Sequence, residues 1–204
     1  MNETPMPPGY FDRLYAHDDD PWRFTTRWYE RRKRALTMAM LPKAHYRRGF
    51  EPGCSIGVLT EELAERCDQL VSTDIAERAL DAARSRLVHA PVEFRLWGLG
   101  QPWAAEDFDL IVLSEVCYYL DPASLREVFE QAVTHLEPGG TLLCAHWRHV
   151  VADYPLTGDD VHAIGRKTAG LSASARYEDE DLLIDVFAAS TRIPPSVAEV
   201  EGLV

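Results

Sequence analysis

The sequence contains few cysteines and no long apolar segment, and these shortages exclude several classes of protein. The four cysteines form no C-x-x-C pair, so neither a zinc site nor a disulfide framework is indicated, and we expect no metal and buried, reduced thiols. No apolar run approaches the roughly 18 residues that a membrane-spanning helix needs. The first residues are polar and proline-rich, unlike a signal peptide. We therefore expect a soluble, cytoplasmic protein with no membrane partner.

Basic residues are also scarce. The 204 residues include 21 Lys and Arg against 33 Asp and Glu, for a net charge of −12, which disfavours nucleic acid as a partner. Residues 1–50 carry 10 basic and 6 acidic side chains, and the rest carry 11 and 27. This acidic main body suits a cationic cofactor and an amine substrate, and ordinary solubility explains it equally well. The length indicates one main domain, as a monomer or a homodimer.

The most informative segment is a strand, a glycine turn and a helix start over residues 47–57, followed by a second strand that ends at Asp74. The first strand ends in Glu51, and the turn contains Gly53 and Gly57. The spacing from Glu51 to Asp74 corresponds to one strand–helix–strand unit, so both carboxylates should lie at the same edge of adjacent parallel strands. A ligand can lie against bare backbone at such a turn, with Asp74 accepting the hydroxyls of a ribose.

The turn lacks the glycines of a dinucleotide site and the lysine of a phosphate-binding loop. Counted from Gly53, Ser55 and Val58 replace the second and third glycines of G-x-G-x-x-G. Glu61 and Glu62 near the helix start would repel a phosphate. The segment therefore predicts a nucleoside with little or no phosphate. S-adenosylmethionine (SAM), a nucleoside with a cationic sulfonium, fits this description, whereas a nicotinamide-dependent reductase is disfavoured.

Strands and helices alternate along most of the chain. Strands are expected over residues 47–51, 69–74, 92–96, 108–114, 141–147, 171–178 and 182–190. Helices are expected over residues 10–16, from 24 or 25 to 40, 57–66, 76–88, from a cap at Asp121 to the turn at 138–140, and from Asp159 or Asp160. This order predicts the α/β class: a Rossmann-like, doubly wound seven-stranded sheet with a C-terminal antiparallel β-hairpin.

Taken together, these segments resemble a class I SAM-dependent methyltransferase over about residues 45–190. The matching pieces are residues 51–57, Asp74, 108–115 and 136–140. Within that superfamily the sequence is similar to the nodulation protein S group, in residues 20–22, 28–31, 114–120 and 146–149. Members of that group methylate an amine on a deacetylated chitooligosaccharide. The resemblance therefore implies SAM as cofactor, S-adenosylhomocysteine (SAH) as product, and N-methylation of an amino sugar or similar small amine.

The resemblance and the expected geometry together assign the cofactor site. Its predicted residues are Glu51, Gly53, Cys54, Ser55 and Gly57 at the methionine tail, Asp74 at the ribose, Ile75, Trp97 and Gly98 at the adenine, and Ser114 and Glu115 at the sulfonium. Two departures from the family stand out. Ser55 replaces a glycine and needs a permitted backbone angle. Trp97 stands where many relatives place an acid near the adenine.

The N-terminal part of the chain lies outside the alternating pattern. We expect a disordered tail over residues 1–8, a helical lid over 9–44 and the SAM-binding methyltransferase domain over 45–204. The lid would place Trp22 or Tyr29 near the methionine end of the cofactor and Arg32 near its carboxylate. The alternative is a helix that simply packs on the sheet.

Three residues are candidates for the chemistry. Glu115 directly follows a central apolar strand, where burial of a carboxylate is costly unless the group is paired or used. We hypothesise that Glu115 orients or deprotonates the acceptor amine, with Tyr119 or His146 assisting. Glu115 as a helix cap and His146 as a core histidine are the simpler interpretations. An O-methyltransferase of a hydroxylated natural product and a non-catalytic SAM-binding protein remain alternative functions.

Overall fold

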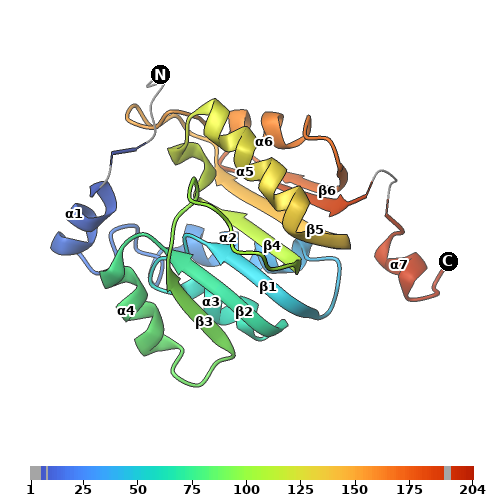
Figure 1. Cartoon of the computed structure of the whole chain (residues 1–204), viewed down its shortest axis with the longest axis horizontal. Coiled ribbons are helices and arrows are strands. Elements are labelled where there is room, and N and C mark those ends of the chain that lie inside the picture. The colour runs from blue at the N-terminus through green and yellow to red at the C-terminus, as the bar shows by residue number, and fades with distance from the viewer. Residues whose placement is uncertain (1–5, 8, 191–193) are drawn as a thin grey trace.

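The computed structural model describes residues 6–7, 9–190 and 194–204, so most of the expected tail lies outside the described residues. Seven strands form one sheet in the order β3-β2-β1-β4-β5-β7-β6 (Figure 1). They are β1 (Tyr46–Pro52), β2 (Cys67–Asp74), β3 (Val92–Leu96), β4 (Phe108–Ser114), β5 (Leu136–Trp147), β6 (Leu171–Glu178) and β7 (Leu182–Ala189). Strands β1 to β5 are parallel, and β7 is antiparallel to both of its neighbours. The predicted seven-stranded α/β sheet with its C-terminal hairpin is confirmed.

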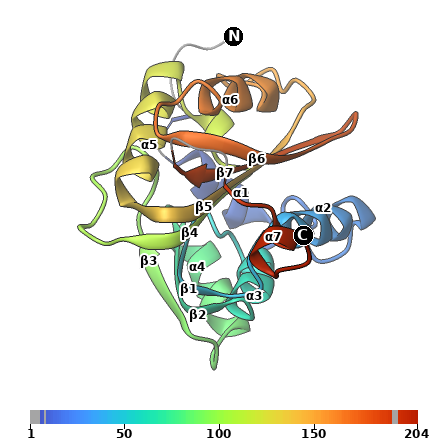
Figure 2. The same cartoon turned by 90° about the vertical axis from the view of Figure 1, so that its right-hand side faces the viewer.

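Helices cover both faces of the sheet (Figure 2). The helical elements are α1 (Tyr10–His17), α2 (Trp28–Met40), α3 (Val58–Ala64), α4 (Glu77–Arg86), the 3-10 turn η1 (Cys117–Tyr119), α5 (Pro122–His135), α6 (Gly158–Gly165) and α7 (Val197–Val200). Helices α5 and α6 contribute to the core on one face, and α2 and α3 to the core on the other. Helix α1 packs on α4 at the edge of the molecule. No helix in the described part of the chain is both long and apolar enough to cross a membrane.

Strand β4 shows why the sheet is covered on both sides. Its apolar residues alternate between the two cores, with Leu110 and Val112 on the side of α3 and Ile111 and Leu113 on the side of α5. All four are at most 1% exposed. A continuous apolar run is what a central parallel strand needs when both of its faces are buried.

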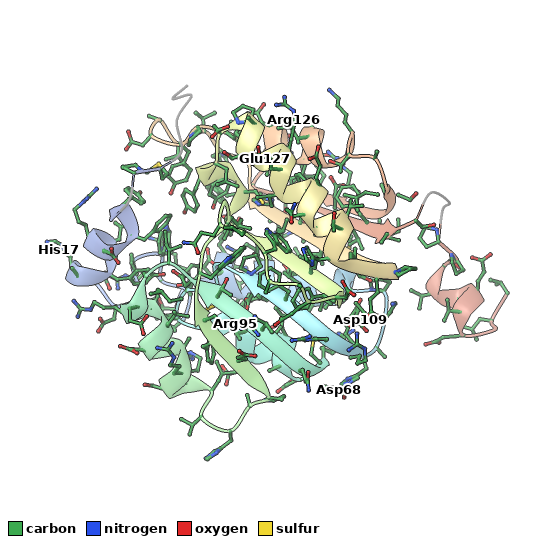
Figure 3. All side chains as sticks on the ribbon, in the orientation of Figure 1. His17, Asp68, Arg95, Asp109, Arg126 and Glu127 are labelled. Carbon is green, nitrogen blue, oxygen red and sulfur yellow. The ribbon has the colours of Figure 1, made fainter. Side chains whose placement is uncertain are left out.

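The chain order reverses between β1 and β4. From β1 the chain continues to β2 and β3 on one side, whereas β4 and β5 lie on the other. The carboxyl ends of β1 and β4 therefore meet where their loops part, which is the usual ligand position in an open α/β sheet. The opposite edge carries Asp68 and Asp109 at the amino ends of β2 and β4, far from His17 at the end of α1 (Figure 3).

Several element boundaries differ from the expected ones. Helix α2 begins at Trp28 rather than at residue 24 or 25, because the Asp20 carboxylate accepts hydrogen bonds from the backbone N–H groups of Phe24 and Thr25 and holds that segment in a loop. The cap of α6 is Thr157, which forms a capping box with Asp160. Asp160 is thus the third residue of the helix and not its start.

The helix α5 begins as expected and ends earlier. Asp121 caps it by accepting hydrogen bonds from the N–H groups of Ala123 and Ser124. The helix stops at His135, and residues 137–140 form an irregular entry into β5, where the pairing register with β4 shifts. The proline and glycines of this segment therefore lie in an irregular part of the strand instead of closing the helix.

Candidate functional site

A cavity of about 270 Å³ lies at the carboxyl edge of β1, β2 and β4. Its wall contains most of the residues that the sequence predicts for the cofactor. These are Trp22, Glu51, Gly53, Cys54, Ser55, Asp74, Ile75, Trp97, Gly98, Ser114 and Glu115, together with the catalytic candidate Tyr119. The wall also contains Glu30 and Lys33 of α2, which the sequence analysis did not assign to a site.

The glycine turn brings the backbone of β1 close to the loop after β4. The N–H groups of Gly53 and Cys54 both donate to the Thr73 carbonyl, at 2.7 and 2.9 Å. Gly53 has φ +75°, and a Cβ at this position would lie 2.1 Å from Cγ1 of Val116. Only glycine fits both the backbone angle and the space. Ser55 adopts φ 52°, the left-handed conformation that a non-glycine residue reaches only at a cost.

Asp74 is held rigidly at the end of β2. Its Oδ2 accepts a hydrogen bond from the Ser55 N–H, and its Oδ1 accepts one from the Ala76 N–H, both at 2.9 Å. Burial raises the pKa of Asp74, and these backbone hydrogen bonds oppose that shift. Each carboxylate oxygen retains a further lone pair, so the side chain can accept two hydroxyl groups without moving.

Glu51 lies deeper at the end of β1 and is 2% exposed. Its Oε2 accepts a hydrogen bond from the Ser72 hydroxyl at 2.9 Å. Burial, with a smaller contribution from the charge of Asp74, raises the pKa of Glu51 from its ordinary 4.5 to about 7. A cation placed beside this carboxyl would favour its ionised form.

Ile75, Trp97 and Gly98 form an apolar slot beside Asp74. Ile75 is 47% exposed, and a Cβ at Gly98 would lie 2.1 Å from its Cγ2, so the glycine makes room for the isoleucine. The Trp97 ring packs on Phe50, and its Nε1–H donates to the Pro102 carbonyl. The indole N–H is therefore already used, and the slot offers surface for a flat ring.

A cluster of charged side chains lines the other end of the cavity. The Glu115 carboxylate accepts hydrogen bonds from the Tyr118 hydroxyl and, at 3.0 Å, from the Trp147 N–H. The Lys33 ammonium lies 3.5 Å from Glu115 and 2.9 Å from Glu30. Burial raises the pKa of Glu30, which Lys33 counteracts, and burial together with Glu115 raises the pKa of Tyr118.

Glu30 and Lys33 had one weak signal in the sequence, their (i, i+3) spacing on a predicted helix. The neighbouring run of basic residues suggested a solvated face instead. In the structure Lys33 is 4% exposed, whereas Arg31 is exposed and stacks on Trp28.

The segment around α1 forms part of the cavity wall. The Tyr15 hydroxyl is hydrogen-bonded to the Ser55 hydroxyl, which links α1 directly to the glycine turn. The Met6 N–H donates to the Tyr119 carbonyl at 3.0 Å. The Trp22 ring packs edge-on against Tyr15. Residues that are distant in sequence thus meet above the carboxyl edge of the sheet, where Figure 1 shows α1 beside α4.

Four predicted site residues lie outside the cavity wall. Arg32 forms an ion pair with Asp179 at 2.8 Å, and the Tyr29 ring packs on Trp147. Gly57 has φ +78° and is the N-cap of α3. His146 is 0% exposed, and its two ring nitrogens face other protein groups.

This arrangement places a rigid carboxylate and apolar side chains at one end of the cavity and a charge cluster at the other. Several carboxylates line the cavity beside the apolar slot, and the rigid Asp74 carboxylate can accept hydrogen bonds from the two hydroxyls of a diol. Among the described residues, no group of three or more His, Cys, Asp or Glu side chains is arranged to bind a metal ion. The four cysteines, Cys54, Cys67, Cys117 and Cys144, are free and buried.

Comparisons with known proteins identify relatives of this chain. The family model described as Nodulation protein S (NodS) matches residues 12–164. Nodulation protein S of Rhizobium tropici is 36% identical over 146 residues, which cover 65% of this chain and 60% of that protein. The chain thus spans less than two thirds of the length of that relative.

Solved structures show the same fold. The NodS N-methyltransferase from Bradyrhizobium japonicum WM9, crystallised with SAH, is 30% identical with a TM-score of 0.79, covering 87% of this chain and 95% of that one. A candidate methyltransferase from Pseudomonas syringae is 43% identical with a TM-score of 0.68, covering 79% of this chain and 99% of that one.

Proposed function

The chain belongs to the nodulation protein S family, and from this premise we propose that it transfers a methyl group from SAM to the nitrogen of a small amine, such as an amino sugar. The observation that carries the proposal is the position of Glu115, a half-buried carboxylate in the wall of a cavity whose other end holds the rigid Asp74. The relative crystallised with SAH is itself described as an N-methyltransferase.

The residues of the cavity fit SAM. Asp74 would accept the ribose hydroxyls, and the slot formed by Ile75, Trp97 and Gly98 would take the adenine. Glu51 lies beneath the glycine turn, where an ammonium would favour its ionised form. When bound, SAM supplies a methyl group activated by a sulfonium.

Glu115 would orient the acceptor amine. An amine must be neutral to attack, so its proton has to leave before or after the transfer. The Glu115 carboxylate can accept that proton, and the hydrogen bonds from Tyr118 and the Trp147 N–H hold it in one orientation. Holding two partners in line can supply several orders of magnitude in rate.

We also propose that residues 9–44 act as a lid on the methyltransferase domain over residues 45–204. The support is the contact of Tyr15 with Ser55 and the presence of Phe11, Trp22 and Phe24 in the cavity wall. Tyr29 and Arg32 would have a structural role in α2, because they contact Trp147 and Asp179 outside the cavity.

The experiment that tests the function combines binding and turnover. Thermal-shift measurements with SAM and SAH should show stabilisation that Asp74→Ala abolishes and Asp68→Ala, at the opposite edge of the sheet, retains. Labelled methyl transfer should then occur to amino sugars or small amines and not to matched alcohols. Transfer to the alcohols alone would indicate an O-methyltransferase, and SAM binding without any transfer would indicate a non-catalytic SAM-binding protein.

A further inference from the structure

Two buried histidines and an aspartate outside the cavity form a continuous line of hydrogen bonds. His146 Nδ1 lies 3.1 Å from His162 Nε2, and His162 Nδ1 lies 2.8 Å from Asp185 Oδ2. At the other end, the Cys117 N–H donates to His146 Nε2 at 3.4 Å. The three side chains are at most 1% exposed. The line therefore connects β7 with η1 through the interior of the protein.

The protons of this line have only one consistent arrangement. A backbone N–H can only donate, so His146 Nε2 must accept and His146 Nδ1 must carry the hydrogen. That hydrogen is donated to His162 Nε2, which leaves the hydrogen of His162 on Nδ1, facing Asp185. In this arrangement each ring carries a single hydrogen, on Nδ1. Burial, the neighbouring His162 and the charge of Lys33 lower the pKa of His146 well below its ordinary value.

The far end of the line is anchored by an ion pair. The Arg166 guanidinium, just after α6, contacts both oxygens of Asp185, with Nη2 at 2.7 Å from Oδ1 and Nε at 2.9 Å from Oδ2. Nη1 of Arg176, on β6, lies 3.6 Å from Oδ1 of Asp185. Although burial alone would raise the pKa of Asp185, the hydrogen bonds from His162 and Arg166 lower it. Asp185 is therefore a fixed anion at one end of the line.

The near end reaches the reacting side of the cavity. The Tyr118 ring packs on His146 with ring centroids 5.5 Å apart and an interplanar angle of 74°. The same tyrosine donates its hydroxyl hydrogen to Glu115. His146 thus contacts η1 twice, through the Cys117 N–H and through the Tyr118 ring.

We propose that His146 is a positioning residue. The line of hydrogen bonds from Asp185 through His162 to His146 holds η1 in place. Through Tyr118 it also fixes the orientation of the Glu115 carboxylate. The catalytic part of this inference rests on the proposed methyl transfer. His146 does not take a proton from the acceptor, because both of its ring nitrogens are occupied by protein groups and its side chain is buried.

The proton arrangement can be tested without any activity. Long-range ¹H–¹⁵N NMR of the ¹⁵N-histidine-labelled protein should show His146 and His162 as neutral rings with the hydrogen on Nδ1. A hydrogen on Nε2 of either ring, or a doubly protonated ring at neutral pH, would contradict the proposed arrangement of hydrogens along this line. This measurement uses the unmodified chain, so it is independent of both variant folding and the proposed function.

The positioning role is tested by two substitutions of His146. His146→Phe removes the acceptor for the Cys117 N–H, whereas His146→Gln supplies an amide that can both accept and donate. By hydrogen exchange, residues 117–119 should lose protection in His146→Phe and keep it in His146→Gln. The exposed His45→Phe serves as a control.

The kinetic outcome separates positioning from proton transfer. We expect His146→Phe to lower kcat about tenfold, with the Kd for SAH within about twofold, and His146→Gln to recover most of kcat. Equal loss in both variants would identify His146 as a base, and full activity in His146→Phe would remove it from the reaction; either result overturns the proposal. If the unmodified chain transfers no methyl group, the function fails while hydrogen exchange still decides whether His146 holds the turn.

Discussion

The ammonium of Lys33 lies 3.5 Å from the carboxylate of Glu115, so helix α2 reaches under the cavity to the end of the central strand β4. The ammonium is shared with Glu30 at 2.9 Å. The side chains of Glu30 and Lys33 are buried and that of Glu115 is half-buried, so two carboxylates face one ammonium. Such a cluster is stable only when every member is paired, and it leaves an excess of negative charge beside the space proposed for a cationic cofactor and an amine.

Removing Lys33 should destabilise the protein. The Lys33→Met variant leaves the buried Glu30 and the half-buried Glu115 without their cation, and we expect the free energy of unfolding to fall by about 3 kcal/mol. Adding Glu30→Gln should restore part of that loss, because only one carboxylate then remains. Urea denaturation measures both effects, and the exposed Lys167→Met is the control. Equal stability of Lys33→Met and the unmodified chain would show that the cluster is not ionised as described.

Neutralising Glu115 should separate turnover from binding. We expect Glu115→Gln to lower kcat by about 10²-fold or more, the usual contribution of a positioned proton acceptor, and to change the Kd for SAH only a few-fold. Steady-state kinetics and calorimetry provide the two values. Glu127→Gln on the surface of α5 is the matched control (Figure 3). Unchanged turnover in Glu115→Gln would remove Glu115 from the chemistry.

The pKa of about 7 at Glu51 makes cofactor binding depend on pH. Near pH 6 the carboxyl is mostly protonated, and an ammonium beside it would expel the proton. We therefore expect SAH binding to release up to one proton and to tighten as pH rises from 5 to 7. Calorimetry in buffers of different ionisation enthalpy measures the release. Its persistence in Glu51→Gln would assign the proton to another group.

Glu51 also affects stability in the absence of cofactor. Between about pH 4.5 and about 7 the folded protein retains a proton on Glu51 that the unfolded chain has lost, so this group's contribution to stability falls as pH rises through that window. The Glu51→Gln variant should lack this decline. Denaturation at pH 5 and at pH 8 compares the two chains, and a difference in stability that does not grow with pH would contradict the shifted pKa.

Two glycines with nearly the same backbone angle provide a matched pair. Gly53 has φ +75° and would meet Val116 if it carried a Cβ, whereas Gly139 has φ +76° and open space around it. Replacement by alanine strains the backbone by about 1 kcal/mol at both positions. We expect only Gly53→Ala to weaken SAH binding, by at least tenfold in calorimetry. Similar affinities for the two variants would show that the close approach of Val116 is not needed.

The lid can be probed with one hydroxyl group. Tyr15→Phe removes the hydrogen bond to Ser55, and we expect the Kd for SAH to rise about fivefold, the equivalent of about 1 kcal/mol. Tyr177→Phe, which removes a hydroxyl bound to Asp179 away from the cavity, should leave the Kd unchanged. Deletion of residues 1–30 tests the lid more severely. An unaltered affinity for SAH in the truncated chain would show that this segment does not cover the cofactor.

The turn and the two acids could be predicted because they depend on local spacing. Glu51, Gly53 and Asp74 belong to one strand–helix–strand unit, and the geometry of that unit places them together whatever the rest of the chain does. The cap at Asp121 was equally local, since the side chain bonds the first turn of its own helix.

The charge cluster and the line of hydrogen bonds from His146 to Asp185 could not be predicted, because they depend on how distant elements pack. Nothing local distinguishes the buried Lys33 from its exposed neighbour Arg31; the difference arises because one face of α2 packs on α3 and the sheet. The hydrogen bond between His146 and His162 likewise requires α6 to lie against β5. A sequence can indicate a buried histidine without indicating its partner.

The hydroxyl contact between Tyr15 and Ser55 has a thermodynamic consequence. The same serine presents its N–H to Asp74, so one residue joins the amino-terminal helix to the acid proposed for the ribose. Any ligand that steadies the serine also steadies the helix, and by reciprocity anything that immobilises the helix increases the affinity for that ligand. If the proposed site binds its nucleoside, the affinity is therefore linked to the order of a helix more than thirty residues upstream of the serine.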